Sequence, residues 1–158
     1  MPPITALLHT KNDGLRLGRT LETLFPCAEI LIVDHDSVDA TLRIAREYGS
    51  RIVFAKSDTP ANRYLSLASH DWILCLDPTE SITEALQATL FEWILLRTDQ
   101  VEQRAFSLRV REQTGEIWRN SPCPETRLIP RNWREWNGHL PDSDPSAVTL
   151  EGELLRFA

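Results

Sequence analysis

The stretch Asp71-Trp72-Ile73-Leu74-Cys75-Leu76-Asp77-Pro78-Thr79-Glu80 decides the fold class of this chain. Its apolar run at 72–76 is unbroken, which is typical of a strand buried on both faces of a parallel sheet. Asp77 follows at once and therefore stands at the carboxyl end of that strand, the edge at which open α/β sheets bind ligands. Pro78 ends the pairing, and Ser81-Ile82-Thr83-Glu84 matches a capping box that opens a helix over 81–95.

Three similar strand–helix units precede this stretch. We expect their strands over residues 4–8, 29–33 and 51–55. The helices between them are expected over 15–24, over a segment with Leu42, Ala45 and Tyr48 on its inner face, and over 60–69. Four such units in succession predict an α/β fold of three layers, α/β/α, around a mainly parallel sheet with right-handed crossovers.

The pattern changes after about residue 96. Further strands are expected over 105–112, 116–118, 126–129 and 147–155, the first two joined by a turn at Thr114-Gly115. Residues 131–146, rich in Trp, Pro, Asp and Asn, are expected to form a surface loop. This part is too small to bury a core alone, so we expect antiparallel C-terminal strands that continue the same sheet. We predict one domain over 1–158, with a nucleotide-binding half at 1–96 and a β-rich, acceptor-side half at 97–158.

Composition excludes several classes of protein. Apolar residues make up 42% of the chain and charged residues 25%, which indicates a globular protein. The net charge of −6 argues against a nucleic-acid partner. The three cysteines are widely spaced, which fits a reducing compartment. The sequence has neither a signal peptide nor an apolar run of membrane-spanning length. Together these features predict a soluble, cytoplasmic protein. Peripheral membrane association and homo-oligomerisation stay open.

Common catalytic motifs do not occur in the sequence. It has no Gly-x-Gly-x-x-Gly after the first strand, no Walker loop and no Gly-x-Ser-x-Gly elbow. The four histidines, His9, His35, His70 and His139, do not have the spacing of zinc ligands. Dinucleotide-binding, P-loop and serine hydrolase functions are therefore not favoured.

Polar residues instead gather at the ends of three expected strands. They are Thr10 and Asp13 after the first strand, Asp34, Asp36 and Asp39 after the second, and Asp77 and Glu80 after the fourth. In a parallel sheet these ends meet at one edge. Clustered carboxylates repel one another unless a cation or hydrogen-bond donors intervene, and oxygen ligands suit Mg²⁺ or Mn²⁺ carrying a diphosphate. Helix capping is the alternative role for Asp13 and Asp39.

Four short motifs follow one another along the first half of the chain. Thr10-Lys11-Asn12-Asp13 is similar to Thr-Tyr-Asn-Glu, and residues 33–41 are similar to Val-Asp-Ser-Gly-Ser-Thr-Asp-Gly-Thr. Arg63-Tyr64 stands for Arg-Asn, and residues 71–80 are similar to Asp-Trp-Val-Leu-Phe-Leu-Asp-Ala-Asp-Glu. In this order the motifs resemble the nucleotide-sugar-binding half of family 2 glycosyltransferases, which have the glycosyltransferase A fold.

Two weaker matches follow in the second half. Residues 126–131 are similar to Arg-Leu-Phe-Arg-Arg of the same family. Trp136-Asn137-Gly138 stands where Trp-x-Gly-x-Val-His-Glu is common in sugar transferases that act on lipopolysaccharide cores. The resemblance thus covers most of the chain and implies a bacterial glycosyltransferase.

The resemblance also implies roles for individual residues. A nucleotide sugar, typically a UDP-sugar, would contact Thr10, Asn12, Asp13, Asp34, Asp36, Arg63 and Asp77, with Asp34 accepting a hydrogen bond from the base. Asp77, with Glu80, would bind Mg²⁺ or Mn²⁺, and this ion would stabilise the departing diphosphate. Asp142 or Asp144 would be the carboxylate that takes the proton of the acceptor hydroxyl. The acceptor itself is not indicated.

Some residues depart from the family pattern and leave two alternatives open. Thr79 replaces the second acid of Asp-x-Asp, Pro141 stands in place of the family's His, and the chain ends at residue 158, where many relatives continue. These departures favour a scaffold or binding module that has kept the fold and lost turnover. A receiver-like phospho-acceptor domain is the third reading, which the antiparallel second half does not favour.

Overall fold

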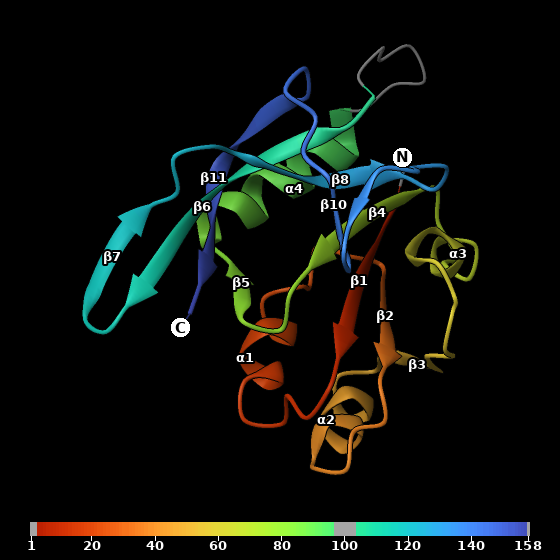
Figure 1. Ribbon diagram of the computed structural model, residues 1–158. Coiled ribbons are helices and arrows are strands. Elements are labelled where there is room, and N and C mark those ends of the chain that lie inside the picture. Colours follow the sequence, from red (N-terminus) through yellow and green to blue (C-terminus); the bar gives the residue numbers. More distant parts are fainter. Residues whose placement is uncertain (1–2, 97–103, 158) are drawn as a thin grey trace.

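Residues 3–96 and 104–157 are described by the computed structural model, in which a curled sheet carries helices on its faces (Figure 1). The helices are α1 (Leu17–Leu21), α2 (Thr41–Glu47), α3 (Ala61–Leu65) and α4 (Glu84–Leu96). The strands of the first half are β1 (Ile4–Thr10), β2 (Glu29–Asp34), β3 (Arg51–Phe54), β4 (Trp72–Leu76) and β5 (Glu80–Ile82). Those of the second half are β6 (Phe106–Thr114), β7 (Ile117–Asn120), β8 (Glu125–Pro130), β9 (Trp136–Asn137), β10 (Leu140–Pro141) and β11 (Val148–Arg156).

The main sheet brings together strands from both ends of the chain. Within the described residues its order is β3-β2-β1-β4-β8-β6-β11-β5, with β7 paired to β6. Strands β3, β2, β1 and β4 are parallel, whereas β8 is antiparallel to both β4 and β6. The expected mainly parallel sheet with antiparallel C-terminal strands is confirmed, with the difference that β11 pairs with β6 in parallel.

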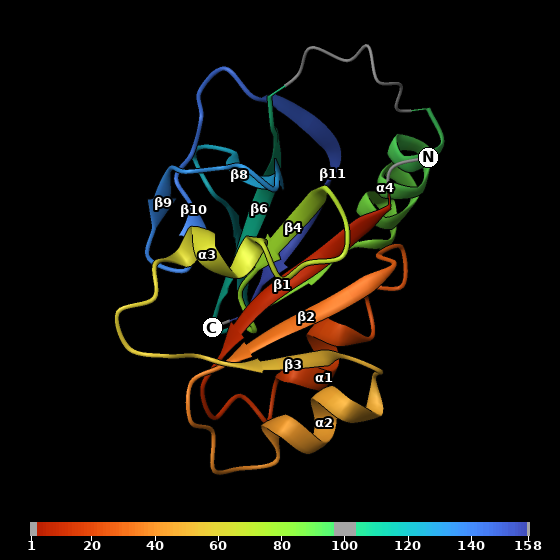
Figure 2. The same cartoon turned by 90° about the vertical axis from the view of Figure 1, so that its right-hand side faces the viewer.

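Each face of the sheet has its own apolar core. On one face α1, α2 and α4 pack through Leu17, Leu21, Ala45, Leu86, Leu90 and Trp93. On the other, α3 packs through Tyr64 and Leu65, and the β9–β10 ribbon packs through Trp136 and Leu140, with Trp133 just before it (Figure 2). The expected three layers are therefore present, and the ribbon supplies part of the second outer layer. Trp133 is buried, so the segment expected as a surface loop contributes to the core.

The register of the parallel strands sets the carboxyl edge of the sheet. Thr10 of β1 lies opposite Asp34 of β2, and Leu8 of β1 lies opposite Leu76 of β4. Asp77 follows β4 directly, so all three polar residues lie at neighbouring strand ends, as the sequence predicts. These strands are almost wholly buried, which fits their unbroken apolar runs.

The fourth helix begins later than expected. It starts at Glu84 and not at residue 81, so the capping-box prediction is wrong. Residues 80–82 form β5, which pairs with β11 in the antiparallel sense. Thr83 opens the helix instead: its hydroxyl accepts a hydrogen bond from the Leu86 N–H and donates one to the Glu153 carbonyl. Because β11 lies about 70 residues further along the chain, the local pattern could not indicate this strand.

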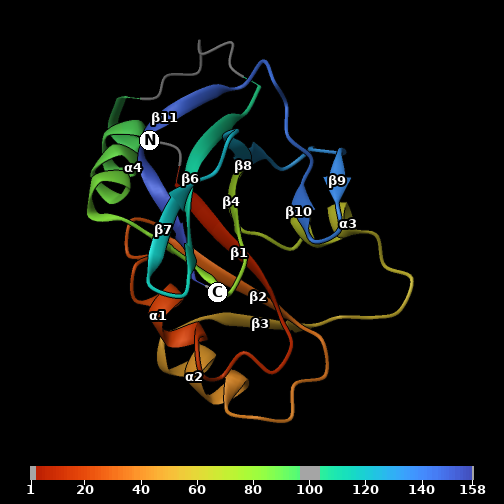
Figure 3. The same ribbon diagram turned by 60° about the vertical axis from the view of Figure 1, so that its left-hand side comes forward.

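Two smaller features complete the fold. Tyr48, expected to face inward from the second helix, is 41% exposed, so that prediction is wrong. The β6–β7 hairpin projects beside the C-terminal end of the chain, where Trp118 contacts Phe157 with ring centroids 5.3 Å apart (Figure 3). In the described ranges, no helix combines the length and apolarity that crossing a membrane requires.

Candidate functional site

A cavity of about 370 Å³ opens at the carboxyl edge of the parallel strands. Its lining comes from the ends of β1, β2 and β4, from the loop that leads into α1, and from the β9–β10 turn: His9, Thr10, Lys11, Asp13, Arg16, His35, Asp77, Pro78 and His139. Three of the predicted site residues, Thr10, Asp13 and Asp77, are among them. This is the edge at which the sequence places a ligand.

Asp34 ties β1 to the loop that follows β2. Its Oδ1 accepts hydrogen bonds from the Thr10 hydroxyl at 2.8 Å and the Ser37 hydroxyl at 2.6 Å. Its Oδ2 accepts one from the Ser37 N–H at 2.9 Å. The carboxylate is buried, and its contacts hold the two strand ends together. Contact with a nucleotide base stays a prediction for this residue.

The loops after β1 and β2 are joined further out by Asn12. Its N–H donates to the Ser37 hydroxyl, and its side-chain oxygen accepts from the Val38 N–H at 2.8 Å. Asn12 and Asp36 both have positive φ, 52° and 57°, a conformation that Asn and Asp tolerate better than most residues. Asp36 is exposed. Both residues therefore shape the rim of the edge.

Asp13 starts the turn that leads into α1. One of its oxygens accepts from the Arg16 Nε at 2.7 Å, and the other accepts from the Lys11 N–H at 2.8 Å. Its backbone N–H donates to the Thr41 hydroxyl. Asp13 is therefore a buried, paired acid, and its ion pair holds Arg16 at the cavity.

Asp39 secures the start of α2. It accepts hydrogen bonds from the Thr41 N–H at 2.9 Å and from the Gly14 N–H at 2.9 Å, and also from the Thr41 hydroxyl. The Thr41 hydroxyl is the largest cause that lowers the pKa of this exposed carboxyl. These bonds give Asp39 a structural role at the start of a helix, which is the alternative to ligand binding.

Asp77 presents a carboxylate with one free oxygen. Its Oδ1 accepts from the Thr79 N–H at 2.9 Å and from the Thr79 hydroxyl at 2.7 Å. Its Oδ2 has no hydrogen-bond partner among the residues that the structure describes. Thr79 thus orients Asp77, and the free oxygen is available to a ligand in the cavity.

Glu80 is occupied elsewhere. Its side chain is fully buried, and its two oxygens accept from the Arg127 guanidinium at 2.6 and 2.8 Å. Oε2 also accepts from Arg156 at 2.9 Å, and Oε1 accepts from the Asp77 N–H at 2.8 Å. The prediction that Glu80 ligates a metal does not fit this arrangement, because both oxygens are already neutralised by arginines.

The remaining predicted site residues lie away from this cavity. Arg63 lines a different cavity beside β3 and α3. Asp142 is exposed just after β10 and accepts a hydrogen bond from the Ser143 N–H. Asp144 accepts from the Ser146 N–H and hydroxyl, and these bonds lower its pKa. None of these three residues is among the described residues that line the cavity.

Three histidines line the cavity although the sequence did not indicate them as site residues. His9 Nδ1 lies 2.9 Å from His35 Nε2. The His139 ring stacks on both, with centroids 4.1 Å from His9 and 4.8 Å from His35. Burial, followed by His139 and His35, lowers the pKa of His9 to about 3. His9 and His35 adjoin Thr10 and Asp34, so the strand-end argument itself could have indicated them.

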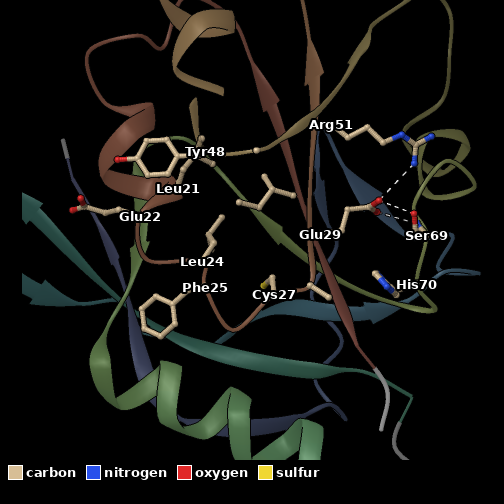
Figure 4. Close-up of a pocket in the computed structure, with 13 residues that line it drawn as sticks. Leu21, Glu22, Leu24, Phe25, Cys27, Glu29, Tyr48, Arg51, Ser69 and His70 are labelled. Carbon is tan, nitrogen blue, oxygen red and sulfur yellow. Dashed lines mark hydrogen bonds and ion pairs between the residues drawn. The ribbon is translucent and has the colours of Figure 1, made fainter. Parts of the chain in front are cut away.

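A larger cavity lies at the opposite edge of the sheet (Figure 4). It has a volume of about 760 Å³ and lies at the amino-terminal ends of the strands. Glu29, an acid that lines this cavity, accepts hydrogen bonds from Ser69 and Thr5 and forms an ion pair with Arg51. These contacts connect the starts of neighbouring strands, so Glu29 has a structural role. The chemistry of the carboxyl edge, with a free carboxylate and two cations, makes the smaller cavity the candidate site.

Comparison with known sequences supports the resemblance. An uncharacterised glycosyltransferase of Rickettsia felis is 28% identical over 118 residues, which are 70% of this chain and 40% of that protein. The lipopolysaccharide core biosynthesis glycosyltransferase LpsC of Rhizobium meliloti is 31% identical over 109 residues, 63% of this chain and 39% of that protein. The chain thus spans about two fifths of the length of these relatives. No family model matches the sequence.

Solved structures confirm the fold. S. aureus TarS 1-349, solved in complex with UDP, aligns with a TM-score of 0.57 and 18% identity over 77% of this chain and 38% of that chain. Mannosyl-3-phosphoglycerate synthase from Rubrobacter xylanophilus aligns with a TM-score of 0.54 and 18% identity over 73% of this chain and 41% of that chain. The glycosyltransferase A fold expected from the sequence motifs is therefore confirmed, and so is the resemblance to glycosyltransferases.

Proposed function

We propose that this chain carries the donor-binding part of a glycosyltransferase, which transfers a sugar from a nucleotide sugar to an acceptor. The observation that carries the proposal is the free carboxylate of Asp77 at the carboxyl edge, in a fold shared with sugar transferases. The nucleotide is proposed to be UDP, because one similar structure is a UDP complex. In this proposal residues 1–96 bind the nucleotide, and residues 97–158 lie toward the acceptor.

The cavity has the charges that a diphosphate needs. Lys11 and Arg16 line it, and Arg16 is held there by Asp13 at 2.6 Å. Arginine matches phosphate oxygens in two-point contacts, and lysine serves as a point charge. Thr10 also lines the cavity, whereas Asn12 and Asp36 lie in the loops that follow β1 and β2. A diphosphate between these groups would leave the base near the β2 end and Asp34.

The proposal includes a divalent ion that has Asp77 as its one protein ligand. Only Asp77 Oδ2 is free among the acids predicted as metal ligands, because Glu80 is paired with arginines. One carboxylate fits an ion such as Mg²⁺ or Mn²⁺ that takes its other ligands from phosphates and water. Such an ion supplies positive charge to a departing diphosphate. Asp77 would hold the ion, and Thr79 would keep Asp77 oriented.

Asp142 is the better of the two proposed bases. It is exposed on the segment that also carries His139, and its Oδ2 has no partner in the described part of the chain. Asp144 is a weaker base, because two bonds from Ser146 lower its pKa. We propose that Asp142 receives the proton of the acceptor hydroxyl.

Calorimetric titration with UDP and UDP-sugars, with and without Mn²⁺, tests the proposal. The wild type is expected to bind, and Mn²⁺ is expected to strengthen binding. Asp77→Asn keeps an oxygen for Thr79 but removes the charge, so it should lose the Mn²⁺-dependent gain, a loss of about tenfold or more, or roughly 1.4 kcal/mol.

Asp71→Asn is the matched control. It removes an acid just before the same strand, where the Asp71 side chain is 92% exposed and the nearest cation is Arg131 at 3.6 Å. This variant should bind like the wild type. If no nucleotide sugar binds under any condition, the proposed function is wrong.

A binding module without turnover is the second candidate. The pairing of Glu80 with Arg127 and the replacement of an acid by Thr79 leave one free carboxylate oxygen where the family pattern has two acids. This module would bind the nucleotide sugar and show no hydrolysis or transfer of the sugar. Product analysis by mass spectrometry after incubation with UDP-sugars distinguishes it from the enzyme.

A further inference from the structure

We propose that His9, His35 and His139 form a binding site for a transition-metal ion such as Zn²⁺. One nitrogen from each ring could act as a ligand, and these three atoms all lie within 4.8 Å of one another. The cluster is formed by the ends of β1 and β2 and by the β9–β10 turn, far apart in the sequence. The inference does not depend on the proposed transferase function.

The buried ring is the first support. Nε2 of His9 is buried and has no hydrogen-bond partner among the described residues. Its other nitrogen lies 2.9 Å from His35 Nε2, and a single proton between them satisfies that pair alone. An unsatisfied buried polar atom costs about 1–3 kcal/mol, so its retention at a cavity calls for a ligand.

The way the fold brings the rings together is the second support. His9 lies at the end of β1 and His35 follows β2, and the His139 ring stacks on both, with centroids 4.1 Å and 4.8 Å away. An imidazole nitrogen that carries no proton offers its lone pair to a metal. Three separate segments of the chain thus place three side chains of a metal-binding kind at one point of the cavity.

The geometry fits an ion after a small movement. Zinc binds imidazole nitrogen at about 2.0–2.1 Å, and a tetrahedral arrangement places the nitrogens roughly 3.3 Å apart. The candidate ligand atoms of the three rings start within 4.8 Å of one another. His139 is exposed on its turn, so its ring can rotate from the stacked position into the ligand position without disturbing the core. A fourth position then stays open toward the cavity, as in catalytic zinc sites.

Nitrogen ligands also select the class of metal. Imidazole suits Zn²⁺, Co²⁺, Ni²⁺ and Cu²⁺, whereas Mg²⁺ prefers carboxylate, carbonyl and water oxygens. The site therefore differs in ligands from the oxygen site proposed at Asp77. Because both face the same cavity, an ion on the histidines would add positive charge to the cavity that Asp77 also lines.

Titration with the metal alone tests the inference. Zn²⁺ and Co²⁺ are titrated into the full chain without nucleotide, by calorimetry and by the visible absorption of Co²⁺. One ion per chain is expected, with binding far stronger than that of Mg²⁺. His139→Ala should weaken Zn²⁺ binding about 100-fold or more, since even loss of a ligand's outer partner costs roughly 10–100-fold. His35→Ala should do the same.

His70→Ala is the matched control. His70 lies at the opposite edge of the sheet, where its Nδ1 is 2.9 Å from the Thr5 hydroxyl. This variant should bind Zn²⁺ as the wild type does. The inference is overturned if the wild type binds no Zn²⁺ or Co²⁺, or if His139→Ala and the wild type bind equally. Because no nucleotide is present, either result leaves the UDP titration to decide the transferase function separately.

Discussion

At the scale of single residues, Glu80 and Asp77 show how neighbouring acids take opposite roles. Glu80 is buried against two arginines, whereas Asp77 keeps a free oxygen at the cavity. Both follow the same strand, and they stand three positions apart in the sequence. The sequence identifies both as acids at a strand end, but it does not show that Arg127 and Arg156 converge on one of them.

The arginine cluster around Glu80 makes stability depend on pH. Burial alone would raise the pKa of Glu125, but Arg127 and Arg156 outweigh it, and the pKa lies below its usual value. A carboxyl with a lowered pKa in the folded state stabilises the fold above its unfolded pKa, about 4.3 for Glu. This contribution is lost as pH falls below that value through the folded pKa.

Glu125→Gln is expected to lower the free energy of unfolding by about 1–2 kcal/mol at pH 7, because it removes charge-assisted bonds from two arginines. Urea denaturation at pH 7 and at pH 4 and below measures the difference from wild type. The difference should shrink as pH falls, because protonated Glu125 resembles Gln. Glu151→Gln, an exposed acid of β11, serves as control. A difference that is constant with pH would contradict this assignment.

At the scale of elements, the contact between β11 and α4 depends on one glycine. Gly152 has a φ of +96° at a break in the β11–β6 register. A Cβ there would lie 2.6 Å from the Leu86 backbone of α4. Only glycine permits both the conformation and this close approach. Thr83 adds hydrogen bonds from the same helix end to Glu153.

Gly152→Ala is therefore expected to cost about 2–4 kcal/mol, from backbone strain and overpacking together. Thermal and urea unfolding measure the cost. Gly115→Ala is the matched control, because Gly115 also has a positive φ, +63°, but has nothing within 4 Å of an added Cβ. It should cost about 1 kcal/mol, the strain alone. Equal costs in the two variants would rule out the α4 contact as the cause.

At the scale of the whole molecule, the last strand completes the sheet. β11 lies between β6 and β5, and its Leu154 is fully buried in the larger core. Its Arg156 bonds to Glu80, Glu112 and Glu125 from three other strands. The two halves of the chain thus share one sheet, and the C-terminal strand stabilises segments far from it in sequence.

A chain that ends at residue 147 is accordingly expected to lose cooperative unfolding. It would expose the edges of β6 and β5 and leave Glu80 with one arginine fewer, against a typical total stability of about 5–15 kcal/mol. Tryptophan fluorescence during urea denaturation measures this, with a chain that ends at residue 157 as control. A cooperative transition with an unchanged midpoint in the shorter chain would contradict the role of β11.

The sequence by itself determined the four parallel strands, their polar ends and the edge at which Thr10, Asp13 and Asp77 meet. These features depend on apolar runs and on residues that are adjacent in the sequence. Because such patterns are local, a single sequence is enough to predict them. The motifs that resemble glycosyltransferases lie in the same segments.

Only the tertiary structure decided the pairing of residues 80–82 with β11, the burial of Glu80 and the cluster of three histidines. Each depends on segments some 50 to 130 residues apart: Glu80 meets Arg127 and Arg156, and His139 meets His9 and His35. Such contacts are set by how the elements pack, which no local pattern encodes. For this reason the sequence indicated the right edge of the sheet but not which groups at that edge are free to bind.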